Sequence, residues 1–296
     1  MHNRSGNVSI KNDLSYLSFY GQSHPFSNFY SHTVVYRALK LDVQGNPISP
    51  EEEMLLSFKT GEALYQWLKA RSQPVQNMCH QIPGNSSSPP DGDVCQAIRN
   101  ADSPRLAKLL GRTTVKCNAD TWSLPRRIAV MREIVALKFS PIAIDEPGMP
   151  NDWMPANTYR FPGKTTVSPS IQLLCSGNVP LIEMSPYDRI WGVGMNANTF
   201  ASFVAINASS AGQTEMEFIN AKYSDPIPDD IAEPIKIKGA NNIVLGLNIL
   251  GRILTERRTE LRESYMATMM TAHEARERSE DNRPPLKRSR IDLEYI

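Results

Sequence analysis

The chain has 296 residues, of which 41% are apolar and 21% are charged. It is long enough to bury a sizeable core and has the composition of a globular protein. Its 32 Lys and Arg residues nearly balance its 31 Asp and Glu residues, which gives a formal net charge of +1. This balance argues against a surface that holds nucleic acid by charge alone, because such domains are strongly basic. A pocket for one phosphate or nucleotide remains compatible with it.

The sequence also argues against several other classes of protein. The longest apolar stretch, residues 243–254, is too short to span a bilayer and contains Asn248 and Arg252. The first residues lack the apolar segment of a secretory signal, so we expect a cytoplasmic protein. Five histidines without a metal-binding spacing argue against a zinc site. We expect no metal and no cofactor. Four widely spaced cysteines are expected to be free thiols: Cys79, Cys95, Cys117 and Cys175.

The first half of the chain predicts short strands and then short helices. Strands are expected at 17–19, 33–36 and 40–43. A helix is expected over 59–71, with Thr60 as its N-cap. Two shorter helices follow, over 93–100 and 103–111. Ser103 and Pro104 begin the second, and Gly111 is expected to end it.

Polar and proline-rich stretches separate the elements. Residues 81–93 predict a surface loop, and 140–170 contain too many prolines for a regular element. Residues 223–234 predict a further acidic connection broken by prolines.

The second half of the chain is also mostly helical. The segment 123–139 has the clearest amphipathic period, and 243–270 predicts a long helix. Strands are expected at 181–182 and in the range 200–205. The charged residues from about 272 onward lack apolar periodicity and predict a disordered tail. Helices outweigh strands without alternating strictly with them, which favours a predominantly helical α+β fold.

The helix at 59–71 carries the first candidate site. Glu62, Tyr65, Gln66 and Lys69 are spaced so that they share one face. A carboxylate, a phenol, an amide and an ammonium on one face can line a polar pocket. From the helical pattern alone, an ordinary solvated face is the better interpretation.

The stretch 181–194 carries the second candidate site. It contains two carboxylates, Glu183 and Asp188, followed by Trp191, Gly192 and Gly194. An indole offers a flat surface for stacking, and glycines allow backbone to approach a ligand closely. A core tryptophan beside a tight turn is an equally good interpretation.

Three further polar residues stand in apolar surroundings. Arg258 lies within the apolar stripe of the long helix and needs an acidic side chain, backbone carbonyls or a bound anion as its partner, unless it reaches the surface. Asn248 lies close to the same stripe, where an unpaired amide would be costly. Asn28, between two phenylalanines, suits a ligand contact or, more simply, a turn.

In their order along the chain, these pieces resemble the NADAR domain, also called the YbiA-like N-glycosidase family. The stretches that carry the resemblance are FYGQSHPFSNFY (19–30), SFKTGEALYQWLKA (57–70), the region from VCQAIRN to VMREIVALKF (94–139), LIEMSPYDRIWGVG (181–194) and GLNILGRILTERRTEL (246–261).

The resemblance implies a YbiA-like (NADAR) fold with small β elements and long loop insertions. It implies one domain over 15–270, with insertions near 140–180 and 195–240. Residues 1–14 then form an N-terminal tail and residues 271–296 a disordered charged tail.

The resemblance also implies hydrolysis of an N-glycosidic bond. The implied substrates are phosphorylated ribosylaminopyrimidines of riboflavin synthesis or ADP-ribosyl conjugates, so nucleic acid would be a partner only as an ADP-ribosylated substrate. No membrane partner is implied.

Position by position, the resemblance implies site roles for residues that match the family's motifs: Glu62, Lys69, Asn28, Glu183, Asp188, Trp191, Gly192, Gly194, Asn248, Gly251 and Arg258. Glu62 would act as the base or stabilise the cation, with Asp188 or Glu183 opposite it. Lys69 and Arg258 would hold phosphate, and Trp191 would stack on the base.

One departure from the family pattern keeps other functions open. Many members have His directly after the glutamate, where this chain has Ala63. A non-catalytic module that binds ADP-ribose or a related nucleotide is therefore the main alternative. A third hypothesis is an interaction protein dominated by its insertions and tail. In that tail, Lys287–Arg290 is a weak candidate for a nuclear import signal.

Overall fold

The computed structural model describes residues 9–10, 14–39, 53–72, 94–117, 119–161, 166–228, 230–231 and 245–281. Within these ranges, eight helices outweigh three two-stranded sheets, so the fold is α+β and mainly helical, as predicted. None of the helices described is both long and apolar enough to cross a membrane.

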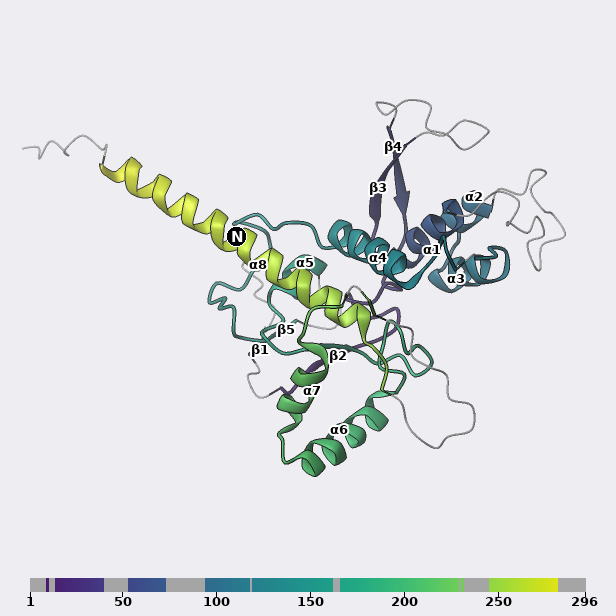
Figure 1. The fold of residues 1–296 in the computed structure, drawn as a ribbon. Helices are drawn as coiled ribbons and strands as arrows, with labels where there is room; N and C mark the ends of the chain where they lie inside the picture. Colours follow the sequence, from purple (N-terminus) through teal and green to yellow (C-terminus); the bar gives the residue numbers. More distant parts are fainter. Residues whose placement is uncertain are drawn as a thin grey trace, which may run out of the picture.

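The strands are β1 (Ser9–Ile10), β2 (Leu17–Phe19), β3 (Val34–Leu39), β4 (Glu53–Phe58), β5 (Tyr159–Arg160) and β6 (Leu181–Glu183). The helices are α1 (Gly61–Arg71), α2 (Val94–Arg99), α3 (Pro104–Thr113), α4 (Leu124–Lys138), α5 (Pro169–Leu174), α6 (Ala197–Ala211), α7 (Glu215–Tyr223) and α8 (Ile249–Asp281). Figure 1 shows α1 to α4 gathered beside the β3–β4 hairpin, with α8 running diagonally past them and α6 and α7 on the other side of α8.

The predicted cap of α1 is confirmed, because the Thr60 hydroxyl accepts a hydrogen bond from the Ala63 backbone N–H at 3.2 Å. Ser103 caps α3 in the same way. The predicted end of α3 at Gly111 is wrong, since the helix continues to Thr113. Gly111 lies inside the helix at a close contact: a Cβ built there would lie 2.0 Å from Gln66 Oε1 on α1.

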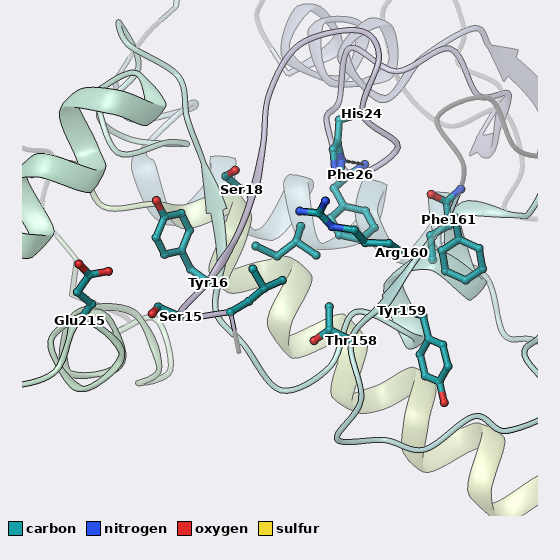
Figure 2. A pocket seen from close by; sticks show the side chains of 13 residues that line it. Ser15, Tyr16, Ser18, His24, Phe26, Thr158, Tyr159, Arg160, Phe161 and Glu215 are labelled. Atoms are coloured by element: carbon teal, nitrogen blue, oxygen red, sulfur yellow. Dashed lines mark hydrogen bonds between the residues drawn. The ribbon is translucent and has the colours of Figure 1, made fainter. Parts of the chain in front are cut away.

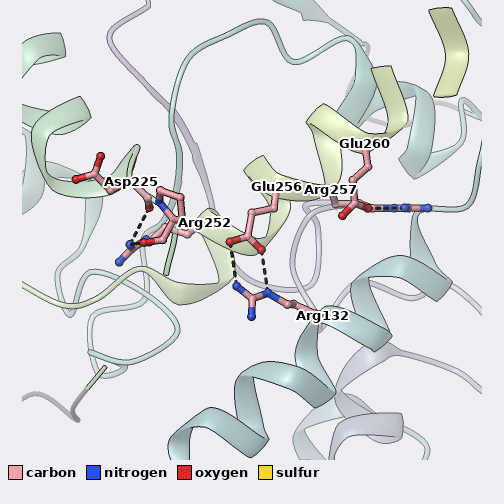
Figure 3. Close-up of polar contacts among 7 residues, drawn as sticks. Arg132, Asp225, Arg252, Glu256, Arg257 and Glu260 are labelled. Carbon is pink, nitrogen blue, oxygen red and sulfur yellow. Dashed lines mark hydrogen bonds and ion pairs between the residues drawn. The ribbon is translucent and has the colours of Figure 1, made fainter. Parts of the chain in front are cut away.

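Charged side chains fasten α8 to its neighbours (Figure 3). Arg132 of α4 donates two hydrogen bonds to the carboxylate of Glu256, at 2.9 and 3.1 Å. Arg252 donates to the backbone carbonyls of Asp225 and Pro226. These contacts fix the first half of α8, while the second half extends away from the rest of the fold in Figure 1.

The boundaries of α8 differ from those predicted. It begins at Ile249 rather than 243, directly after Asn248, which has a left-handed φ of 50°. It continues to Asp281, so residues 272–281 are helical and not a disordered tail. Its exposed last turns are rich in good helix formers, and an exposed i, i+4 ion pair joins Glu274 and Arg278 there. Residues 282–296, with the basic cluster, lie outside the described residues.

The described part of the region 195–240 is not a long loop, because α6 and α7 occupy most of it. The strand expected within 200–205 is therefore wrong, and those residues lie in α6. Asn196 caps α6, and Thr214 with Glu217 forms a capping box at α7. These local start signals outweigh the β-branched and aromatic residues that suggested a strand.

The strands at 17–19, 33–36 and 181–182 are confirmed with small changes of boundary, whereas β4 was not predicted. β4 pairs antiparallel with β3. The strand at 40–43, the loop at 81–93 and Cys79 lie outside the described residues. The described residues between 140 and 170 are largely irregular, as expected, apart from β5 and the start of α5. Cys117 and Cys175 are free thiols.

Candidate active site

Glu62 lies in the first turn of α1 and is buried, with 5% of the residue exposed. Its backbone N–H donates to the Asn28 carbonyl at 3.0 Å, which joins the helix to the turn that precedes β3. Tyr65 and Gln66 are buried on the same helix. These three side chains are therefore turned into the fold and do not form the ordinary solvated face that the helical pattern favoured.

Gln66 orients the Glu62 carboxylate. Its Nε2 donates to Glu62 Oε1 at 2.8 Å. Its own Oε1 is buried and accepts no hydrogen bond from the residues described. That oxygen faces Gly111 of α3 so closely that no larger residue fits there without displacing it. The contact between α1 and α3 thus sets the position of the carboxylate.

Lys69, one turn further along α1, donates from Nζ to the Gly111 carbonyl at 2.7 Å. It ties α1 to α3 near the C-terminal end of α3, where a cation also complements the helix dipole. Lys69 therefore contributes to the same α1–α3 contact as Gln66.

Glu183 ends β6, which pairs in parallel with β2. Its Oε2 is buried without a hydrogen-bond partner among the described residues. Its backbone is held on both sides, since Glu183 N donates to Asn248 Oδ1 at 2.9 Å and Val193 N donates to the Glu183 carbonyl at 3.0 Å. The carboxylate thus projects from a backbone with little freedom to move.

Asp188 organises the turn after β6. Its Oδ1 accepts from the backbone N–H groups of Ile190 and Trp191 at 3.1 and 2.9 Å, and its carbonyl accepts from Gly194 N at 3.1 Å. Gly194 has a φ of 70°, which favours glycine. A Cβ on Gly192 would lie 2.7 Å from the Glu183 carbonyl, so this glycine allows the turn to lie against β6.

Aromatic contacts bring this turn to α1. The rings of Tyr65 and Trp191 meet edge to face with centroids 5.7 Å apart, and Trp122 packs on Tyr65 at 5.5 Å. Glu62 and Asp188 raise the pKa of Tyr65 above its ordinary value, although burial is the largest cause. The two predicted motifs therefore meet around Tyr65.

The carboxylates influence one another's ionisation. Burial raises the pKa of Glu62, and the nearby Asp188 raises it further, while Lys108 and the Gln66 hydrogen bond oppose this. Burial raises the pKa of Glu183 to about 8, with added contributions from Asp188 and Glu62. Such a Glu183 side chain is mostly protonated near neutral pH.

Lys108 of α3 was not predicted as a site residue. Its charge partly offsets the rise in the pKa values of Glu62 and Glu183. Its Nζ lies 5.3 Å from the centre of the Phe29 ring. An exposed lysine on an amphipathic helix carries no signal by itself. Its place in the site results from the packing of α3 on α1, which no sequence signal indicates.

Asn28 is buried beside Glu62. Its Nδ2 lies 2.8 Å from Met131 Sδ, and its Oδ1 is buried without a partner among the described residues. The preceding carbonyl, that of Ser27, accepts from the buried Lys138 ammonium at 2.7 Å. Burial lowers the pKa of Lys138 to about 7. This lysine fixes the turn that supports the start of α1.

Asn248 and Arg258 have backbone partners. Besides accepting from Glu183 N, Asn248 donates from Nδ2 to the Leu181 carbonyl at 2.8 Å, so it holds β6 in place. Arg258 donates from Nη1 to Ser176 Oγ at 3.1 Å and to the Val179 carbonyl at 2.8 Å. The structure thus gives Arg258 the carbonyl partner that its burial required, and none of these contacts joins it to Glu62 or Trp191. Gly251 packs against the Leu181 carbonyl, where a Cβ would lie 2.0 Å away.

Three hollows described in the structure are lined by other residues. The largest, about 600 Å³, lies beside β2 and β5. A smaller one of about 320 Å³ is lined by Met184 and Pro186, which follow Glu183 directly. Three buried acceptor atoms of the candidate site lack hydrogen-bond partners among the described residues: Asn28 Oδ1, Gln66 Oε1 and Glu183 Oε2.

Comparison with known families gives one match. A model of the NADAR domain matches residues 18–262, which is more than half of the chain and includes all the elements of this cluster. No curated protein matches the chain.

Proposed function

The chain belongs to the NADAR family, and from that premise we propose that it is an N-glycosidase with a YbiA-like fold. Its substrate would be a phosphorylated ribosyl metabolite, such as a ribosylaminopyrimidine phosphate of riboflavin synthesis, or an ADP-ribosyl conjugate. The observation that carries the proposal is the contact between Tyr65 and Trp191, which brings α1, with Glu62, to the turn that contains Asp188 and follows Glu183. The charge of Asp188 raises the pKa of both glutamates, which burial already raises.

The ionisation of these groups suits a division of roles. Cleavage of the bond between ribose C1′ and the base nitrogen leaves positive charge on the ribose, and the nitrogen needs a proton to leave. Glu183, with a pKa of about 8, supplies that proton near neutral pH. Glu62, oriented by Gln66 and near the charge of Lys108, stabilises the cation and takes a proton from the attacking water.

The remaining groups would bind and orient the substrate. Asp188 is held by two N–H groups through Oδ1, which leaves Oδ2 to face the ribose. The hydroxyls of a ribose can supply hydrogen bonds to the buried, unpartnered acceptors of Asn28 and Gln66. Lys108 is a better candidate than Arg258 for holding phosphate, because the guanidinium of Arg258 already donates to Ser176 and Val179.

A second candidate function rests on Ala63. This residue directly follows Glu62 and is 2% exposed. Because it is an alanine, it offers no imidazole for proton transfer. A module that binds ADP-ribose without cleaving it would keep the same binding residues and lack turnover.

One pair of measurements tests the proposal. The full chain is incubated with ribosylaminopyrimidine phosphate, NAD, ADP-ribose and ADP-ribosylated guanosine, and release of base is measured by chromatography. Calorimetry with ADP-ribose runs in parallel. Release of base from at least one substrate supports the N-glycosidase. Tight binding of ADP-ribose without release of base from any of the four contradicts it and supports the binding module.

A further inference from the structure

The largest described hollow has no role in the reaction proposed above. Its volume is about 600 Å³, and it lies between residues 14–18, which lead into β2, and residues 158–161 around β5 (Figure 2). Small-molecule sites in proteins usually have volumes of about 300–1,000 Å³. The hollow is therefore large enough for a separate ligand.

An unpaired cation reaches into this hollow. Figure 2 shows the Arg160 side chain extending from β5 toward Phe26 and His24. In the part of the chain that the structure describes, its guanidinium makes no hydrogen bond or ion pair. A guanidinium stays charged and presents paired donors that match a carboxylate or a phosphate. The hollow therefore offers a site for one anionic group.

His24 supplies a second donor on the same side. Its Nδ1 accepts from the Phe26 backbone N–H at 3.3 Å, so the ring hydrogen of the neutral form is on Nε2. Burial, with help from the charge of Lys138, lowers the pKa of His24 to about 4, so the ring is neutral at physiological pH. A neutral imidazole N–H beside a guanidinium suits an acceptor oxygen.

The remaining walls favour a flat ligand with charge at one end only. Tyr16 lines the hollow and is only partly buried, so its ring can stack on a planar ligand. Glu215 lies on the side of Tyr16 that faces away from Arg160 in Figure 2. Burial raises the pKa of the Tyr16 phenol, and the charge of Glu215 raises it further. A second anionic group at that end would be repelled.

We propose that this hollow is a second ligand site, which binds a small planar ring compound through one carboxylate or phosphate held by Arg160. The inference does not depend on the proposed glycosidase activity, because it uses none of the carboxylates in the cluster around Glu62.

Calorimetry with the full chain tests the site. Nicotinate and adenosine monophosphate are the two probes, since one carries a carboxylate and the other a phosphate. Nicotinamide and adenosine are the matching controls without the anionic group. Inorganic phosphate is the control without a ring. We expect at least one acid to bind, with affinity about tenfold or more above that of its counterpart and of inorganic phosphate, because a charged hydrogen bond would be lost.

Three variants locate the binding. Arg160→Ala should weaken it about tenfold or more, and because Arg160 is exposed the melting temperature should not change. Arg37→Ala, which removes an exposed arginine from β3, should leave it unchanged. Glu62→Gln should also leave it unchanged. The proposal is overturned if neither acid binds, if Arg160→Ala binds as well as the original chain, or if Glu62→Gln abolishes binding, which would assign the ligand to the carboxylate cluster.

Discussion

Tyr65 and Trp191 lie far apart in the sequence, yet their rings meet edge to face with centroids 5.7 Å apart. This contact places the turn that contains Asp188 against the helix that contains Glu62. Edge-to-face aromatic pairs contribute about 0.5–1.5 kcal/mol beyond their buried area. In this fold the pair also holds together the elements that carry Glu62 and Asp188, which are proposed to act on the same ribose. A change in the packing of these two rings should therefore affect the reaction.

Replacing Glu62 with Gln should remove most turnover while the melting temperature stays near that of the original chain. A positioned acid or base contributes about 10²–10⁴-fold to a rate. The variant removes a buried charge and keeps the shape of the side chain, so little stability is at risk. Base release and a thermal melt check both parts. Glu260→Gln, which changes an exposed carboxylate on α8, is the matched control. Full activity of Glu62→Gln on every accepted substrate would rule out the assigned role.

Glu183 should make the protein less stable as the pH rises from about 4.5 to 8. Its pKa is raised from 4.5 to about 8 in the folded chain, so the folded state binds more protons than the unfolded state in that window. The free energy of unfolding then falls with increasing pH, by at most about 1.4 kcal/mol per pH unit. Urea unfolding at pH 5, 6, 7 and 8 measures the slope. Glu183→Gln should flatten it, and an unchanged slope in that variant would show that Glu183 titrates normally.

Local signals in the sequence were sufficient for the elements that begin with a cap. Thr60 and Ser103 begin α1 and α3 because their side chains satisfy backbone N–H groups, and that chemistry depends only on nearby residues. The predicted end of α3 at Gly111 is wrong because glycine inside a helix was interpreted as a helix terminator. Its actual role is to admit Gln66, and that contact is visible only in three dimensions.

In the candidate site, too, the sequence indicates residues in motifs but not contacts that depend on how helices pack. Its carboxylates could be named from the sequence, since Glu62, Glu183 and Asp188 stand in recognisable motifs. Lys108 could not, because its proximity to two of them results from how α3 packs on α1. Arg258 was expected to hold phosphate, but burial of a guanidinium predicts only that it has a partner. In the structure that partner includes the Val179 carbonyl.

Lys138 should make the protein more stable as the pH rises from about 7 to 10.5. Its pKa is lowered from 10.5 to about 7 by burial, so in this window the unfolded chain holds a proton that the folded chain has released. The free energy of unfolding therefore increases with pH across that range. Lys138→Met should lose this increase, although it also loses the hydrogen bond to the Ser27 carbonyl, worth about 1 kcal/mol. Urea unfolding at pH 7, 8 and 9 measures it, and an equal increase in the variant would contradict the assignment.

Lys108→Met should raise KM for a phosphorylated substrate by about tenfold and leave KM for the dephosphorylated compound unchanged. A lysine that holds phosphate contributes about one charged hydrogen bond, which corresponds to that factor. Because Lys108 is exposed, the variant should melt like the original chain. Steady-state kinetics on the two compounds provide the comparison, with Lys222→Met on α7 as the control. An equal rise in KM for both compounds would mean that Lys108 acts on the carboxylates and not on phosphate.

Gly111→Ala should destabilise the protein and reduce activity, contrary to the usual effect in a helix. Replacing a helical glycine with alanine normally stabilises by about 1 kcal/mol. In this chain the new Cβ would lie 2.0 Å from Gln66 Oε1 and 2.7 Å from Gln66 Cδ, so the amide must move and its hydrogen bond to Glu62 is disturbed.

Removing the Gln66 side chain beyond Cβ separates this clash from a general intolerance of alanine at the position. The double variant Gly111→Ala with Gln66→Ala should be less destabilised than the sum of the two single variants, because most of the clash has gone. Activity should stay low, since Glu62 still lacks its partner. The free energy of unfolding of all four proteins completes the cycle. Strict additivity would show that Gly111 and Gln66 do not interact, and the α1–α3 contact would then not determine where Glu62 lies.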